Sequence, residues 1–240
     1  MNLQGVPTGN YQQLEKLMII RSGLIKNHDT VDFGEFSKHW KDVHGPLARI
    51  VPRMRAYSQN HIKKTLVTGE QFGFHRVDGI SQLRFDTLAD MAAGMDSPEQ
   101  HACIVDIQGF LSGVTILIQE EGKLNEFGQA TTNGIKIMYL LRGDDGRLAQ
   151  LLDALSKVLS ATGGSFRLNR IINRGFRVHS AVPAGDQMID GVLEVFLAGD
   201  VTGENFNEAA AIESSPGIDV IGAYEVSEYV VLPLQEERKA

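Results

Sequence analysis

The sequence of 240 residues predicts an α+β fold in which two ferredoxin-like β-α-β-β-α-β halves follow one another. Apolar runs typical of strands alternate with helical periodicity in this order, and the order then repeats. Turn signals repeat with it, because Asp78-Gly79-Ile80 and Ser97-Pro98 are matched by Asp190-Gly191-Val192 and Ser215-Pro216. A period near 112 residues indicates duplication of a whole domain and excludes a solenoid repeat.

The first half is predicted to span residues 15–121. Its first helix begins at Asp32, and its apolar side chains recur at helical spacing. We expect this helix to stop at His44-Gly45-Pro46, because glycine accepts a left-handed cap and proline cannot continue a helix. A second helix opens at Ser97-Pro98-Glu99, with proline in its first turn. The predicted strands are Lys16–Arg21, Met54–Ile62, Ile80–Phe85 and Gly113–Gln119.

A polar segment with two glycines leads into a second, degenerate domain at residues 135–235, and residues 122–134 are predicted to be the linker. In this domain Gly146–Leu159 carries leucines at helical spacing, and Asn205–Ile212 is predicted to be a short helix. The predicted strands are Ile135–Leu141, Phe166–Ile172, Val192–Leu197 and Ile218–Leu232.

Composition excludes several classes of function. The net charge is −7, which is unfavourable for nucleic-acid binding. No run reaches the length that a membrane helix needs, and Met1–Tyr11 has no features of a signal peptide. One cysteine, Cys103, allows no internal disulfide, so we expect a cytoplasmic protein. Cys103 itself is predicted to be a small core residue.

The segment from Phe36 to Leu47 contains His39-Trp40 and His44-Gly45-Pro46, and it is followed by Pro52, Tyr57, Gln59, Asn60 and His61. This run resembles the signature of the EthD family, and the later Asp78-Gly79-Ile80 and Ser97-Pro98-Glu99 add to the match. The resemblance covers residues 15–121, whereas the second half has no such segment. It implies a fold of the dimeric α/β barrel type with antiparallel sheets, closed within one chain or paired with a second copy.

Six of the seven histidines lie in the first half, which suggests that any site belongs there, because histidine suits proton transfer near neutral pH. Candidate catalytic residues are His44, Tyr57, His61 and His75. His44 continues the apolar stripe of its helix, at the end where the helix dipole favours a cation; it is equally readable as a helix cap. Tyr57 and His61 share one strand face with Arg55 and Gln59. We expect this polar face to line the barrel interior.

Candidate substrate-binding residues are His39, Trp40, Arg55 and Gln59. No metal site is expected, because His39 and His44 do not share a helix face and no Cys pair or HExxH occurs. We also expect no haem or flavin, although the resemblance extends to haem peroxidases.

Three functions remain open. The leading hypothesis is a cofactor-free acid–base enzyme, an isomerase, dehydratase or cyclase, acting on a small hydrophobic or aromatic compound. The first alternative is an EthD-like oxidoreductase or monooxygenase acting on a phenolic substrate. The second is a barrel that binds a hydrophobic ligand without catalysis, as in a stress response.

Overall fold

The structure is a computed structural model that describes residues 17–70, 75–128, 134–176, 189–197 and 211–235. In the first half the helices are α1 (Phe33–His39), the π-helix η1 (Trp40–His44), α2 (Gly45–Arg49), α3 (Leu88–Met95) and α4 (Pro98–Phe110). The strands are β1 (Ile19–Asn27), β2 (Met54–Val67), β3 (Gly79–Phe85) and β4 (Leu111–Glu120). The sequence did not predict α3.

The predicted linker contains a short strand, β5 (Asn125–Phe127). The second half holds the helix α5 (Asp145–Thr162) and the strands β6 (Ile135–Arg142), β7 (Gly164–Phe176), β8 (Gly191–Leu197) and β9 (Asp219–Leu232). Most of the predicted helix Asn205–Ile212 lies outside the described residues, as do Glu15, Lys16 and His179.

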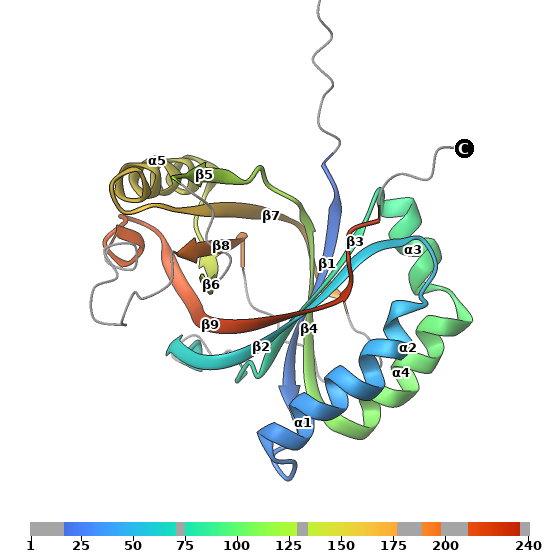
Figure 1. The fold of residues 1–240 in the computed structure, drawn as a ribbon. Helices are drawn as coiled ribbons and strands as arrows, with labels where there is room; N and C mark the ends of the chain where they lie inside the picture. Colours follow the sequence, from blue (N-terminus) through green and yellow to red (C-terminus); the bar gives the residue numbers. More distant parts are fainter. Residues whose placement is uncertain (1–16, 71–74, 129–133, 177–188, 198–210, 236–240) are drawn as a thin grey trace, which may run out of the picture.

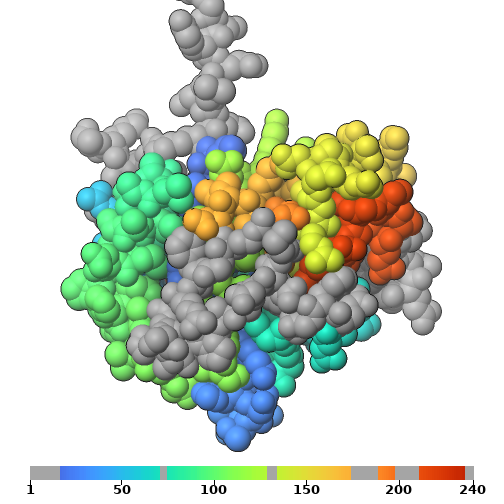
Figure 2. Space-filling model, turned by 180° about the vertical axis from the view of Figure 1, so that it is seen from behind, coloured from blue at the N-terminus to red at the C-terminus, as the bar shows by residue number. Residues whose placement is uncertain are grey.

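The strands close into an antiparallel barrel with helices on its outside (Figure 1). Eight strands follow one another in the order β4-β1-β3-β2-β9-β6-β8-β7, and β7 pairs back to β4. β5 extends the edge of β7. The α+β class and the antiparallel sheets are therefore as predicted. Figure 2 shows, from behind, the first half in blue to green beside the second half in yellow to red.

The two halves have the same strand order, because β4-β1-β3-β2 matches β9-β6-β8-β7 position for position. The turns before β3 and β8 also match. The amide of Asp78 donates to the Ile25 carbonyl at 2.8 Å, and the amide of Asp190 donates to the Leu141 carbonyl at 2.8 Å. Each aspartate also accepts a hydrogen bond from a backbone amide at the end of the first strand of its half, Asn27 at 2.9 Å and Gly143 at 3.0 Å.

Helices cover the outer faces of the barrel separately in the two halves. The helices α1 to α4 lie on the first-half strands, and α5 lies on the second-half strands (Figure 1). In α5 four leucines spaced three or four residues apart are buried against the sheet, as the periodicity predicted; they are Leu148, Leu151, Leu155 and Leu159. On the first half, Phe36 and Trp40 pack against Phe110 at the end of α4.

The first helix does not stop at Gly45, contrary to the sequence prediction. Gly45 is helical, with φ −53° and ψ −55°, and its amide donates to the Trp40 carbonyl across the wider turn of η1. A π-turn removes the need for an amide hydrogen at Pro46, so the proline enters at the first turn of α2. His44 is thus inside a continuous helical segment, and the helix-dipole argument made for it does not hold.

The polar face of β2 is turned opposite to the prediction. Tyr57, Gln59 and His61 lie under the first-half helices, where Gln59 Nε2 donates to the Trp40 carbonyl at 2.7 Å. The barrel interior instead receives Ser58 and Asn60, which continue a polar layer. Asn60 contacts Gln82, and Gln82 donates to the fully buried Glu194 at 2.9 Å.

The interior layer ties the two halves together through charge. Burial alone would raise the pKa of Glu194, but Lys136, Arg167 and Arg84 outweigh burial and lower it strongly. Lys136 Nζ lies 3.0 Å from the Glu194 carboxylate. One part of the interior is thus a paired ionic layer, and an apolar cluster that includes Leu24, Met138 and Val192 fills another part.

No helix in the described part of the chain is long and apolar enough to span a membrane.

Candidate functional site

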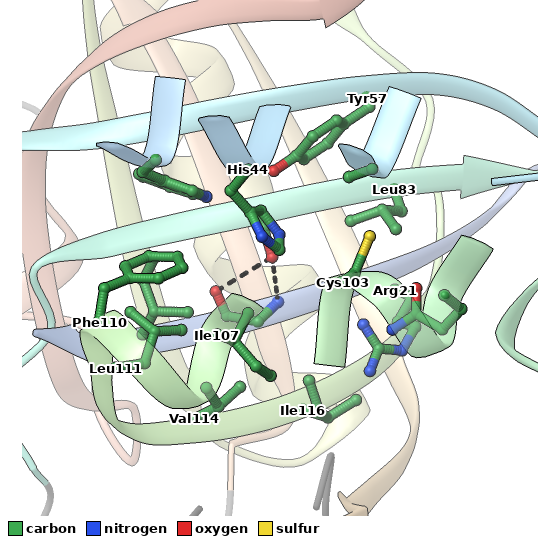
Figure 3. Close-up of a pocket in the computed structure, with 16 residues that line it drawn as sticks. Arg21, His44, Tyr57, Leu83, Cys103, Ile107, Phe110, Leu111, Val114 and Ile116 are labelled. Carbon is green, nitrogen blue, oxygen red and sulfur yellow. Dashed lines mark hydrogen bonds between the residues drawn. The ribbon is translucent and has the colours of Figure 1, made fainter. Parts of the chain in front are cut away.

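A small cavity lies between the outer face of the first-half sheet and the helices above it (Figure 3). Its volume is about 60 Å³. Most of its wall is apolar, formed by Leu83, Ile107, Phe110, Leu111, Val114 and Ile116. A few polar side chains interrupt this wall, chiefly Arg21, His44, Tyr57 and Cys103. An apolar cavity with few polar groups is typical of a small-molecule site.

His44 is held in the cavity wall by a carboxylate. Its Nδ1 lies 2.8 Å from Asp106 Oδ2, and its side chain is 11% exposed. Because an ionised carboxylate only accepts hydrogen bonds, Nδ1 carries the proton in this pair. No hydrogen bond joins Nε2 to any described residue, so in the neutral ring Nε2 keeps a free lone pair. This is the arrangement of a general base whose orientation is fixed from behind.

Asp106 serves two histidines. Its other oxygen lies 2.9 Å from His39 Nε2, and Phe110 packs against both imidazoles, with ring centroids 4.6 Å from His39 and 5.5 Å from His44. Burial would raise the pKa of Asp106, but hydrogen bonds from His44 and His39 lower it below its ordinary value. Asp106 is therefore ionised at neutral pH and fixes His44 in one tautomer.

Tyr57 ends a second chain of hydrogen bonds, whose direction can be deduced. Gln59 Nε2 donates to the Trp40 carbonyl and, at 3.1 Å, to the Tyr57 hydroxyl, so Gln59 Oε1 must be an acceptor. His61 Nε2 therefore donates to Oε1 at 3.2 Å, and in the neutral ring its Nδ1 accepts from Ser37 Oγ at 2.8 Å. The chain leaves the Tyr57 hydroxyl proton free to donate.

The pKa values agree with this direction. Burial lowers the pKa of His61 to about 4, with a smaller effect of Lys41, so the ring is neutral near pH 7. Burial raises the pKa of Tyr57 far above 10, despite hydrogen bonds from Gln59 and Trp40. Figure 3 shows its hydroxyl directed toward His44. Tyr57 thus presents a neutral O–H donor beside the base.

Gly45 packs closely against the same chain of hydrogen bonds. A Cβ added to Gly45 would lie 3.3 Å from Gln59 Nε2, which is closer than most real contacts. The glycine in His44-Gly45-Pro46 therefore makes room for the amide that orients Tyr57, and does not form a left-handed cap.

Two further polar side chains face the cavity. The burial of Arg21 lowers its pKa to about 10, which still leaves it charged at neutral pH. The burial of Cys103 raises its pKa to about 11, with a smaller contribution from Asp106. Cys103 is thus a neutral thiol in the wall, as its prediction as a small core residue implies.

The structure separates the residues that the sequence grouped. His44, Tyr57 and Trp40 line the cavity. Gln59 lies one hydrogen bond behind it and His61 two, and His39 is linked to it through Asp106 and Phe110. Arg55 does not line the cavity; it lies at the start of β2, where it pairs with Asp86 at 2.7 Å. His75 also lies elsewhere, with Nε2 2.8 Å from Thr115 Oγ1.

Asp106 and Arg21 were missed by the sequence analysis, although each left a signal. Asp106 is an acidic residue on the apolar face of α4, between Cys103 and Phe110. Arg21 is the charge inside the apolar run of β1. A charged residue where burial is expected points to a partner or a ligand.

No group of three or more His, Cys, Asp or Glu side chains is placed to hold a metal ion in the part of the chain that the structure describes. The site is therefore defined by an oriented imidazole base, a neutral phenol donor and a guanidinium, all in one apolar cavity on the outside of an α+β barrel.

Residues 28–113 match the EthD domain family. This range includes all the residues of the two hydrogen-bond networks, the one around Asp106 and the one that ends at Tyr57. The resemblance drawn from the sequence is therefore confirmed over residues 28–113. No curated protein matches the sequence significantly.

Several solved structures share the fold across the whole chain. An anthrone oxidase-like protein is 8% identical, with a TM-score of 0.55, over 93% of this chain and 97% of its own. A proposed monooxygenase from Fusobacterium nucleatum is 6% identical, with a TM-score of 0.54, over 95% and 100%. Another from Lactobacillus acidophilus is 8% identical, with a TM-score of 0.50, over 90% and 95%. At these identities the similarity shows the fold alone.

Proposed function

We propose that this protein is an oxidoreductase that uses molecular oxygen to oxidise a small hydroxylated ring compound, without a bound organic cofactor. One observation carries the proposal. The free Nε2 of His44, oriented by Asp106, shares an apolar cavity with the Tyr57 hydroxyl. The names of the structural relatives, monooxygenases and an anthrone oxidase-like protein, favour oxidation over the isomerisation that the sequence analysis placed first.

In this proposal His44 Nε2 removes a proton from an acidic O–H or C–H of the substrate. The Tyr57 hydroxyl donates a hydrogen bond to the oxygen that becomes negative, because its own acceptor position is already taken by Gln59. The resulting anion is rich in electrons and passes them to oxygen. For a dihydroxylated ring oxidised to a quinone, the two hydroxyl hydrogens and two electrons pass to O₂, which leaves as hydrogen peroxide. For a ring CH₂ oxidised to C=O, one oxygen atom stays on carbon and the other leaves as water with both hydrogens.

The cavity limits how the substrate enters. About 60 Å³ is the space of about two water molecules, whereas a cavity that binds benzene is roughly 150 Å³. A ring compound therefore fits only after the wall widens. The wall on the helix side includes Ala48 of α2 and Ile107 of α4, so we infer that these helices move apart on binding.

An acid–base isomerase is the second candidate, because an oriented histidine and a phenol donor would serve it equally. The two candidates differ in one requirement, since isomerisation consumes no oxygen. A barrel that only binds its ligand would show neither reaction.

We also infer that the chain arose by duplication of one ferredoxin-like domain. The support is the shared strand order and the matching turns at Asp78 and Asp190. On this inference the second copy has lost the site, since its helix α5 packs on the sheet through leucines. This would leave the EthD domain as the reacting half.

The experiment is an oxygen-electrode assay with two probes, anthrone for a ring CH₂ and 2,5-dihydroxybenzoate for a dihydroxylated ring. We expect oxygen uptake with at least one probe, and a loss of about 10²–10⁴-fold in His44→Gln. His101→Gln is the control, because His101 is exposed on α4. Absorbance spectra of the protein check for bound haem or flavin. Product formed at the same rate without oxygen would exclude the oxidase proposal.

A further inference from the structure

The positive charge of Arg21 is the feature of the cavity that the proposed reaction does not use. Arg21 lies in the middle of β1, with its side chain in the cavity wall beside Cys103 (Figure 3). The remaining wall around it is apolar or neutral and includes Leu83 and Ile116. A cation in such surroundings loses much of its hydration and is costly to bury.

Among the described residues, no carboxylate lies within ion-pair distance of Arg21. Other partly buried arginines of the barrel are paired: Arg84 lies 3.0 Å from Glu121, and Arg55 lies 2.7 Å from Asp86. Arg21 is itself partly buried. Because an unpaired charge that is partly withdrawn from water destabilises the folded state, its presence calls for a function. An anionic ligand would supply the missing partner.

The position of Arg21 separates it from the reacting groups. In Figure 3, His44 and Tyr57 lie close together, while Arg21 stands on the far side of Cys103. The Tyr57 donor and the His44 base suffice for one oxygen atom of the substrate. Arg21 therefore suits a second, permanently charged group. A guanidinium presents its N–H donors in a planar fork that matches the two oxygens of a carboxylate.

We propose that Arg21 binds the carboxylate of a small aromatic carboxylic acid, and that this contact turns the hydroxylated part of the ring toward His44. The choice of reacting group rests on the proposed function, whereas the choice of a carboxylate rests on Arg21 alone. The substrate class is thus a hydroxylated aromatic acid of few atoms, since the cavity is small.

The test compares two probes of equal shape, 2,5-dihydroxybenzoate and 2,5-dihydroxybenzamide, which differ in charge. Binding is measured by isothermal titration calorimetry without oxygen, so that no oxidation occurs. We expect the wild-type protein to prefer the acid by at least about tenfold, and Arg21→Gln to lose this preference. Arg21→Lys keeps the positive charge but lacks the planar fork of N–H donors, so this variant should retain only part of the preference for the acid. Arg49→Gln, an exposed arginine on α2, is the control and should behave as the wild type.

Thermal unfolding separates a ligand-binding role of Arg21 from a structural one. If Arg21 awaits a ligand, Arg21→Met should unfold at the same temperature as the wild-type protein or higher, because an unpaired charge has been removed. Saturating 2,5-dihydroxybenzoate should raise the unfolding temperature of the wild type but not that of Arg21→Met. A clear loss of stability in Arg21→Met would instead assign Arg21 a structural role and overturn the proposal.

Three binding results would also overturn it: equal affinity for acid and amide, no binding of either probe, or an acid preference that survives in Arg21→Gln. The outcome is independent of the oxygen assay. A protein that prefers the acid but consumes no oxygen would refute the proposed oxidation and leave the carboxylate site intact. Oxygen uptake without any preference for the acid would refute the carboxylate site and leave the proposed oxidation intact.

Discussion

Protonation of His61 is expected to destabilise the folded protein, because this imidazole is buried as the neutral link between Ser37 and Gln59. It is 8% exposed, and its ring lies 4.5 Å from that of Trp40. Its pKa is about 4 in the folded protein, against 6.5 for an ordinary histidine. Between these values the unfolded chain binds more protons than the folded protein, so the free energy of unfolding falls as the pH falls.

The difference between the two pKa values corresponds to about 3 kcal/mol, lost progressively between pH 6.5 and pH 4. His61→Gln removes this contribution, so its stability should depend less on pH over the same range. Comparing the variant with the wild type cancels the contribution to the pH dependence from carboxylates that titrate in both proteins. His101→Gln, at an exposed position, should keep the full pH dependence of the wild type.

Urea denaturation at several pH values between 4 and 8 measures these free energies. Trp40 is the only tryptophan and touches His61, so its fluorescence follows both unfolding and the charge of His61. If wild type and His61→Gln lose stability in parallel as the pH falls, His61 titrates normally. The deduced direction of the hydrogen bonds to Tyr57 would then have no support.

Two other predictions concern the site and its packing. Asp106→Asn should lower turnover about 10²–10⁴-fold while the fold survives, because the amide can stabilise the wrong tautomer of His44; steady-state kinetics and circular dichroism would show this, and unchanged kinetics would contradict it. Gly79→Ala should cost about 1–3 kcal/mol in denaturant melts, because its Cβ would lie 2.5 Å from the Trp40 ring. Gly109→Ala is its control: no atom lies within 4 Å of the added Cβ, so it should stabilise α4 by about 0.5–1 kcal/mol, and equal effects of both changes would refute the packing argument.

The sequence was sufficient for most strands and for α5, because burial periodicity and turn residues are local signals. It missed β5 and predicted the first strand at Lys16–Arg21, whereas β1 spans Ile19–Asn27. The Asp-Gly pairs are an example of a local signal, since each stands at the turn into a strand, β3 or β8. The backbone amides that the two aspartates bind are not local, because they lie 51 and 47 positions away. The path from Trp40 to Arg49 was not readable in this way. Proline signals a helix end locally, and the π-turn that admits Pro46 depends on packing between η1 and the sheet.

The site was predicted only in part, again because sequence patterns are local and do not show which distant segments pack together. His44 and Tyr57 were identified, but Tyr57 was assigned to the barrel interior. A period of two separates the faces of β2 without saying which is inside, and both faces carry polar residues, as Ser58 and Gln59 show. Asp106 lies 62 positions from His44. Their pairing requires the helix packing, which no local pattern encodes.

The central claim is that His44 presents a free, unprotonated Nε2 to the cavity because Asp106 holds the proton on Nδ1. Long-range ¹H–¹⁵N correlation spectra of the imidazole observe this directly, at a pH where His44 is neutral. We expect the Nδ1–H tautomer in the wild type, loss of that single tautomer in Asp106→Asn, and a shift of the His44 Nε2 resonance when 2,5-dihydroxybenzoate is added. A neutral His44 protonated on Nε2 in the wild type would contradict the account.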